Sequence, residues 1–281
     1  MVEVVLTPTE SKKLIAKAVF NRSCVQKALK KGIVAIHPSS STIYIYEAIT
    51  GTMPEGLWVC GVVSSKGLCG SNQAVAMIKS RGPGAHNPLE VSKETWFFKN
   101  GKLQAPEPLG VILDQMTEAD VYIKGSNALD PQGNVGVLFA NPAGGGGTIG
   151  KVMAAKRQKG FHVILPIGLE KLIPISIKQA SRAAKFRKGE AMGIPSGLIP
   201  VTGEKIDEID ALKSFGVTAT PFAAGGLAGA EGAVSIVLEG DETSVHQVFQ
   251  MIKTIKGTQL PVLEVPDSQS AYYPTLAIEH S

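Results

Sequence analysis

The sequence predicts an α/β protein with a mainly parallel sheet flanked by helices, followed by a smaller ferredoxin-like α+β domain. In the first two thirds of the chain, short apolar runs alternate with segments of helical periodicity, as in parallel sheets that carry helices on both faces. After about residue 196 the order becomes strand, helix, two strands, helix and strand, which is that of a ferredoxin-like unit. We therefore expect domains at residues 1–195 and 196–270 and a tail at 271–281.

Two helices are expected before the first strand of the parallel sheet. The first covers residues 7–19, with Thr9 as its N-terminal cap and apolar residues at helical spacing behind it. The second covers residues 23–32 and ends at Gly32, because glycine most easily adopts the left-handed conformation that follows many helices.

The parallel sheet is predicted from repeated strand, loop and helix units. A buried strand at residues 33–38 is followed by a serine-rich turn and by a helix at 43–49. Asn100-Gly101 is the turn of a hairpin within residues 94–104. The other units are a strand at 56–63 with a helix at 73–79, helices at 111–119 and 148–160, and strands at 120–125 and 162–168.

The ferredoxin-like domain is predicted from residue 197 onward. Its strands are expected at 197–201, 217–224, 233–240 and 260–265, and its helices at 205–216 and 243–257. The second helix carries an apolar stripe and should lie on a sheet; the stripe is formed by Val245, Val248, Phe249, Ile252 and Ile255. Since sheets of this type often pair across subunits, we expect a homo-oligomer.

Composition and charge exclude several classes of protein. The net charge of +4 is modest and the basic residues are scattered, which does not indicate nucleic-acid binding. The three cysteines lack zinc-ligand spacing, so no metal is expected. The apolar stretch 215–238 contains glycines, Pro221 and Glu231, which favours two strands joined by a loop over a membrane span. The N-terminus lacks a secretory signal pattern, so we expect a cytoplasmic protein.

Polar residues after the strand at 120–125 indicate a ligand site at the carboxyl end of the sheet. Lys124 lies at the end of this strand, Asp130 follows it, and four glycines, Gly144, Gly145, Gly146 and Gly147, come shortly after. Lys124 can neutralise an anion, and Asp130 can accept hydrogen bonds or act as a base. For Asp130 a structural role in the turn 130–133 is favoured. Asn127 and Asn141 flank the region as neutral hydrogen-bonding partners.

A second candidate element is the turn at residues 39–42. Ser39, Ser40, Ser41 and Thr42 stand at the start of an expected helix, where backbone N–H groups and hydroxyls favour a phosphate or carboxylate. Ordinary N-capping of the helix is the alternative interpretation.

The glycines at 144–147 allow close approach of backbone to a ligand, or form a flexible connection.

Residues 119–156 resemble the central signature of the superfamily that unites ribose-phosphate isomerase, the coenzyme A transferases, the DeoR-type sugar sensors and the lactate-utilisation proteins. The residues that match the isomerase motif are Gly125, Asp130, Pro131, the glycines at 144–147 and Lys151. Those similar to the transferase motif are Ile123, Lys124, Asp130, Gly133 and Asn134. The turn at 39–42 resembles the phosphate-binding turn of the superfamily. The resemblance implies a Rossmann-like fold and a pocket for an anionic ligand.

The catalytic glutamates of that superfamily are not matched. Asn127 and Ala128 replace the acidic pair of the isomerases, and Gly150 occupies the place of their glutamate base. Two functional classes remain. One is an enzyme, of isomerase or coenzyme A transferase type, acting on a sugar phosphate, an acyl-coenzyme A or an organic acid, with Lys124 and Asp130 as catalytic residues. The other is a metabolite sensor, or an assembly protein that uses its ferredoxin-like domain. No cofactor is expected; coenzyme A would enter as part of a substrate.

Overall fold

The computed structural model describes residues 1–54, 59–64, 67–70, 95–139, 147–184 and 196–262, without the side chains of 60–62 and 68–70. Its centre is a six-stranded sheet in the order β12-β10-β7-β2-β5-β6. Four strands are parallel: β2 (Ile33–His37), β7 (Val121–Lys124), β10 (His162–Pro166) and β12 (Glu204–Ile206). The hairpin β5 (Trp96–Lys99) and β6 (Lys102–Leu103) extends the sheet antiparallel to β2. The mixed α/β class and the mostly parallel sheet are as predicted.

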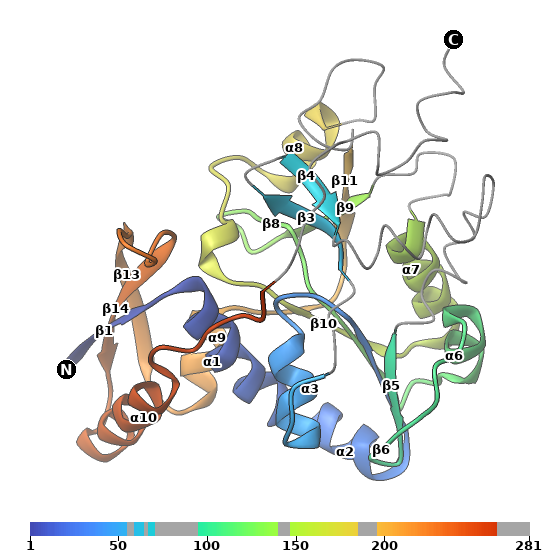
Figure 1. Cartoon of the computed structure of the whole chain (residues 1–281), viewed down its shortest axis with the longest axis horizontal. Helices are drawn as coiled ribbons and strands as arrows, with labels where there is room; N and C mark the ends of the chain where they lie inside the picture. The colour runs from blue at the N-terminus through green and yellow to red at the C-terminus, as the bar shows by residue number, and fades with distance from the viewer. Residues whose placement is uncertain (55–58, 65–66, 71–94, 140–146, 185–195, 263–281) are drawn as a thin grey trace.

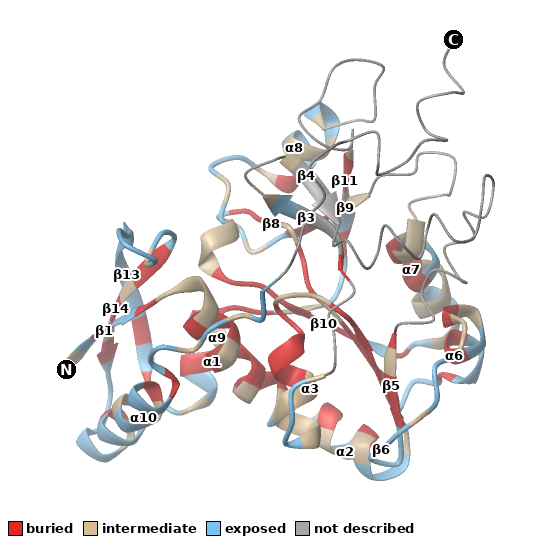
Figure 2. Ribbon diagram, viewed as in Figure 1, coloured by how far each residue is buried: buried red, intermediate tan, exposed pale blue. Residues whose placement is uncertain are grey.

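Both faces of this sheet are covered by helices (Figure 1), and Figure 2 shows that much of the interior is buried. Alternate residues of β2 point into two cores: Val34 and Ile36 pack into the first core, whereas Ile33 and Ala35 pack into the second. The helices that contribute to the first core include α1 (Pro8–Phe20), α2 (Ser23–Lys31), α3 (Ile43–Thr50) and α9 (Glu208–Ser214); α6 (Leu109–Gln115) and α7 (Gly147–Lys159) contribute to the second. The sheet is thus the middle of three layers.

The N-terminal cap of α1 is Thr7, and the prediction of Thr9 is wrong. The Thr7 hydroxyl accepts a hydrogen bond from the Glu10 N–H at 3.3 Å, and the Glu10 carboxylate accepts one from the Thr7 N–H at 2.9 Å. This reciprocal capping box, with Pro8 at the first helical position, places Thr9 inside the helix.

Two expected turns have different outcomes. Asn100 and Gly101 have positive φ angles of 52° and 75°, so the predicted hairpin turn is confirmed. Gly32 caps α2, but its φ of −160° is extended and not left-handed as predicted. Glycine is required there for space, because a Cβ would lie 2.5 Å from the Asp120 carboxylate. That carboxylate also accepts the N–H of Ile33 at 2.6 Å and fixes the start of β2.

Three further small sheets surround the central one. The antiparallel sheet β1-β14-β13 comprises β1 (Val2–Leu6), β13 (Thr218–Gly225) and β14 (Ala233–Glu239), and α10 (Glu242–Ile255) packs against β1. A second sheet comprises β8 (Ala128–Leu129), β9 (Val135–Phe139) and β11 (Gly197–Val201). β3 (Cys60–Ser64) pairs antiparallel with β4 (Gly67–Gly70) in a two-stranded sheet of its own, so the expected place of the strand 56–63 in the parallel sheet is wrong. Two short helices follow β10, η3 (Leu169–Lys171) and α8 (Ile177–Ala183).

The ferredoxin-like unit is not confirmed, because its expected strands belong to different sheets. β11 pairs with β9. Residues 205 and 206, which were expected in a helix, belong to the strand β12, which extends the central sheet beside β10. The third strand beside β13 and β14 is β1, from the opposite end of the chain. The division into domains at residue 195 stays a prediction, although strands on its two sides pair with one another. In the described part of the chain, no helix is long and apolar enough to cross a membrane.

The capping box gives a direct stability prediction. Thr7→Ala removes the side-chain acceptor for the Glu10 N–H, so it should lower the free energy of unfolding by about 1 kcal/mol. Thr9→Ala is the matched control and should change it by less than about 0.5 kcal/mol. Urea unfolding followed by circular dichroism measures both. Equal losses for the two variants would contradict the assignment of Thr7 as the cap.

Candidate functional site

The four parallel strands end at one edge of the central sheet, and each is followed there by polar residues. The turn 39–42 follows β2, and Gly125 and Ser126 follow β7. Glu170 and Lys171 lie in η3 after β10, and Glu208 starts α9 after β12. Ligands of open α/β sheets bind at this edge. The strand pairing therefore gathers, in one region, residues that are far apart in the sequence.

The turn at residues 39–42, called the serine turn below, is stabilised by hydrogen bonds of Thr42. Two of its backbone N–H groups have no acceptor among the described residues. The Thr42 hydroxyl donates to the His37 carbonyl at 2.6 Å, and the Ser39 carbonyl accepts the N–H groups of Thr42 and Ile43, both at 3.1 Å. No described residue accepts a hydrogen bond from the N–H of Ser40 or Ser41. Helix α3 has no side-chain cap of its own. The turn therefore presents free donors at a helix start, which suits an anion better than a simple N-cap.

Gly125 brings the end of β7 directly against this turn. A Cβ at position 125 would lie 2.5 Å from the Ser39 Oγ and 3.5 Å from the Ser41 Cβ. Any larger residue would push β7 and the turn apart. Gly125 and the serines are thus predicted site residues that the structure does bring together.

Lys171 joins the turn to the end of β7 and was missed in the sequence. Its Nζ donates to the Ser41 Oγ at 3.2 Å and to the Ser126 carbonyl at 2.7 Å. Burial lowers the pKa of Lys171 to about 8; the Lys12 charge also lowers it, whereas Glu170 and Glu208 raise it. The Ser126 hydroxyl is buried and has no hydrogen-bond partner among the described residues.

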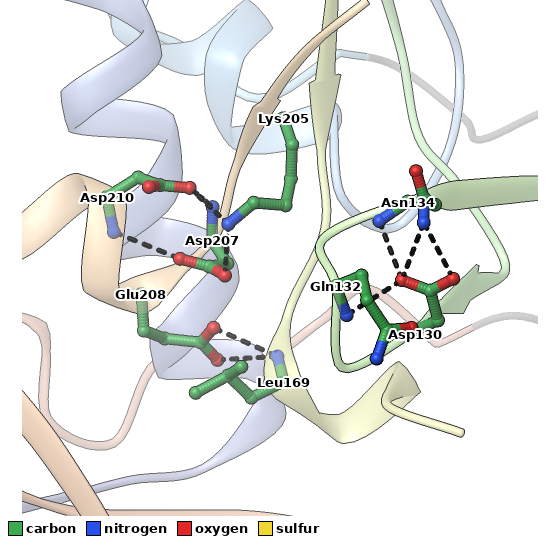
Figure 3. A network of polar contacts seen from close by, with 8 residues as sticks. All are labelled: Asp130, Gln132, Asn134, Leu169, Lys205, Asp207, Glu208 and Asp210. Atoms are coloured by element: carbon green, nitrogen blue, oxygen red, sulfur yellow. Dashed lines mark hydrogen bonds and ion pairs between the residues drawn. The ribbon is translucent and has the colours of Figure 1, made fainter. Parts of the chain in front are cut away.

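Three further charged residues lie around η3. Lys12 and Glu170 form an ion pair at 3.2 Å. The Glu208 carboxylate accepts the N–H of Leu169 at 2.9 and 3.2 Å, as Figure 3 shows. Burial is the main cause that raises the pKa of Glu208 to about 7. The charge of Glu170 also raises it, whereas hydrogen bonds from the Ser11 hydroxyl and the Leu169 N–H lower it. A half-buried lysine and a buried glutamate with such perturbed pKa values are typical of functional sites.

The signal for these missed residues was their position after a strand. Glu170 and Lys171 directly follow the predicted strand 162–168, as Ser39 follows the strand 33–38. The same argument that selected the turn at 39–42 would have selected them. No group of three or more histidine, cysteine, aspartate or glutamate side chains in the described ranges could hold a metal ion.

Lys124 ends β7 and lies opposite His37 of β2 in the strand register. Burial lowers the pKa of His37 well below its usual value, and the Lys124 charge lowers it further. His37 is therefore neutral at pH 7, with the Tyr122 hydroxyl 3.5 Å from its Nδ1. The predicted catalytic role of Lys124 stays a prediction.

Asp130 is engaged in the turn between β8 and β9 (Figure 3). Its carboxylate accepts five hydrogen bonds: from the backbone N–H groups of Gln132, Asn134 and Ile177, and two from the Asn134 side chain. Burial raises the pKa of Asp130, but the hydrogen bonds, led by that of Ile177, outweigh this and lower it overall. The geometry matches the turn interpretation, and a role as a base stays a prediction.

The other predicted residues have different surroundings. The Asn127 Oδ1 accepts the Leu138 N–H at 3.0 Å, and its own N–H donates to the Gly136 carbonyl at 2.9 Å, so Asn127 joins β8 to β9. Gly147 begins α7 with a φ of 61°. Asn141, Gly144, Gly145 and Gly146 lie outside the described residues.

A second polar region lies beside α9, where a cavity of about 240 Å³ is lined by residues that include Arg22, Glu204, Lys205 and Asp210. Most of its charges pair internally. Lys205 contacts Asp207 and Asp210, both at 2.5 Å (Figure 3), and Arg22 pairs with Glu204. The pairs of Lys205 hold the start of α9, which carries Glu208, whereas Lys213, which also lines the cavity, forms no ion pair with a described residue.

Comparisons with known proteins give one weak similarity. No family model matches the sequence, and no curated protein does. Among solved structures, a ribose 5-phosphate isomerase A from Neisseria gonorrhoeae is 11% identical, with a TM-score of 0.25, over 92% of this chain and 89% of that chain.

The raised pKa of Glu208 predicts how stability changes with pH. A free glutamate has a pKa of about 4.3, so between about pH 4 and pH 7 the folded state binds more protons than the unfolded state, and stability falls as pH rises. Glu208→Gln should therefore raise the melting temperature at pH 8 and change it little at pH 4. The exposed Glu118→Gln is the control and should have no such pH dependence. A lower melting temperature for Glu208→Gln at pH 8 would contradict the buried, raised-pKa state.

Proposed function

We propose that this protein binds a small anionic metabolite at the carboxyl edge of its central sheet. The observation that carries the proposal is the hydrogen bond from Lys171 to Ser41, which holds a cation against the serine turn. The unused N–H groups of Ser40 and Ser41 add donors of the kind that bind phosphate or carboxylate. An anion there would receive both charge neutralisation and directed hydrogen bonds.

The candidate ligands are a sugar phosphate, an acyl-coenzyme A or an organic acid. Each presents an anionic group small enough for a turn of four residues. Lys12 adds a second cation to the neighbourhood, although Glu170 pairs with it. The protein would use no cofactor, and coenzyme A would be part of a substrate.

One observation favours a binding protein over an enzyme that uses Asp130 as its base. Both oxygens of Asp130 accept hydrogen bonds, and its pKa is lowered, whereas a general base needs an accessible lone pair and a pKa near the working pH. A metabolite sensor is therefore the second candidate function. Isomerase or transferase activity would have to use other groups of the site.

A thermal-shift assay tests the proposal with inorganic phosphate, ribose 5-phosphate, acetyl-coenzyme A and lactate. A ligand at 100 times its dissociation constant adds about 2.7 kcal/mol to the stability, which should raise the melting temperature by about 5 °C. The double variant Ser41→Ala with Lys171→Gln should lose the shift. Lys178→Gln, an exposed lysine of α8, should keep it. An equal shift in the double variant would place the ligand elsewhere, and no shift with any probe would refute the proposal.

A further inference from the structure

The hydrogen bonds of Lys171 match those of a neutral amine. A neutral lysine has two N–H groups and one lone pair, whereas the charged form has three N–H groups. The Nζ of Lys171 donates two hydrogen bonds, to the Ser41 hydroxyl and to the Ser126 carbonyl. No third acceptor for it is found among the described residues. The neutral form is thus fully satisfied, and its lone pair is unengaged.

The surroundings also enlarge the neutral fraction of Lys171, although the charged form still predominates at pH 7. Lys171 is half-buried, and desolvation is the main cause that lowers its pKa. The charge of Glu170 raises the pKa, that of Lys12 lowers it, and that of Glu208 raises it. With a pKa of about 8, roughly a tenth of Lys171 is neutral at pH 7, compared with less than a thousandth of an ordinary lysine. A lysine that is desolvated and lies near another cation is the kind that acts as a nucleophile towards carbonyl groups.

The Ser126 hydroxyl is an independent sign of a ligand. It is buried without a hydrogen-bond partner among the described residues, which is costly unless something binds to it. Its own backbone carbonyl holds Lys171, so the hydroxyl belongs to a residue that touches the amine. A carbonyl or hydroxyl oxygen of a ligand would satisfy it.

We propose that Lys171 forms an imine with an aldehyde or ketone that carries an anionic group. This inference rests on the proposed binding of an anion at the serine turn and narrows the ligand to a carbonyl compound. Because Ser41 belongs to the turn and also touches Lys171, an anionic group on the turn and a carbonyl carbon at Lys171 are only a few atoms apart in the ligand.

The step needs no oxidant or reductant. The lone pair of Lys171 forms a bond to the carbonyl carbon, the carbonyl oxygen takes a proton, and the nitrogen releases one, which gives a carbinolamine. The hydroxyl group then takes a second proton and leaves as water, and the nitrogen loses its remaining proton or stays protonated as an iminium.

Borohydride trapping tests this inference. The protein is incubated at pH 7.5 with glycolaldehyde phosphate, with glyoxylate, or with uncharged glycolaldehyde, then reduced with sodium borohydride and mapped by peptide mass spectrometry. We expect a reduced adduct on Lys171 that forms at least about tenfold faster than on the exposed Lys178, because the neutral fraction of Lys171 is larger. The two charged probes should react faster than glycolaldehyde, and inorganic phosphate should slow them.

Two variants keep the test decisive. Lys171→Arg keeps the charge and donors but cannot form an imine, so it should lose the adduct and keep the thermal shift with phosphate. Ser126→Ala should slow trapping at Lys171 without removing that shift. Adducts formed at equal rates on Lys171 and Lys178, or none on Lys171, would overturn the imine proposal. If phosphate still stabilises the protein in that case, anion binding stands alone; if it does not, both proposals fail.

Discussion

The parallel pairing of β2, β7, β10 and β12 is the constraint on which the rest of the structure depends. It aligns the carboxyl ends of four strands, so residues separated by long stretches of sequence meet at one edge. Lys171 and Ser41, for example, are 130 positions apart in the chain. The two apolar cores fix this register, because a shift of one residue in β2 would exchange Val34 and Ile36 with Ile33 and Ala35 between the faces.

Electrostatics then decides what this edge can do. Lys12, Glu170, Lys171 and Glu208 bring two positive and two negative groups into a poorly hydrated region, which is unfavourable unless they pair or lose their charge. Lys12 and Glu170 pair, whereas Lys171 and Glu208 move their pKa values towards neutrality. The edge therefore holds a base and an acid that both exchange protons near pH 7, which is a condition for acid–base or nucleophilic chemistry.

Much of the central sheet could be predicted because its signals are local. Each of three signals depends on a few neighbouring residues: the run 33–38, the turn at 39–42 and the Asn100-Gly101 turn. The turn at 39–42 contributes directly to the proposed site. The cap of α1 was assigned two residues late, since the role of Thr7 depends on Glu10 and Pro8 together. The η3 segment has only three residues and no periodicity, so Lys171 had no pattern of its own.

The pairing of distant strands was the part that the sequence could not determine. The order of elements after residue 196 fits a ferredoxin-like unit, but order does not specify partners. β1, at the start of the chain, completes the sheet of β13 and β14, and β12 completes the central sheet and places Glu208 beside η3. Asp130 is an example of a local signal that sufficed. Its residue pattern predicted a turn, and in the structure its carboxylate accepts the N–H groups of Gln132 and Asn134 within that turn.

Anomalous diffraction from a crystal soaked in sodium tungstate tests the central claim most directly. The anion should bind within hydrogen-bonding distance of the N–H groups of Ser40 and Ser41 and close to the Nζ of Lys171. Tungstate found only elsewhere on the protein, for instance beside the exposed Lys213, with no density at the turn, would contradict the account of this edge as an anion site.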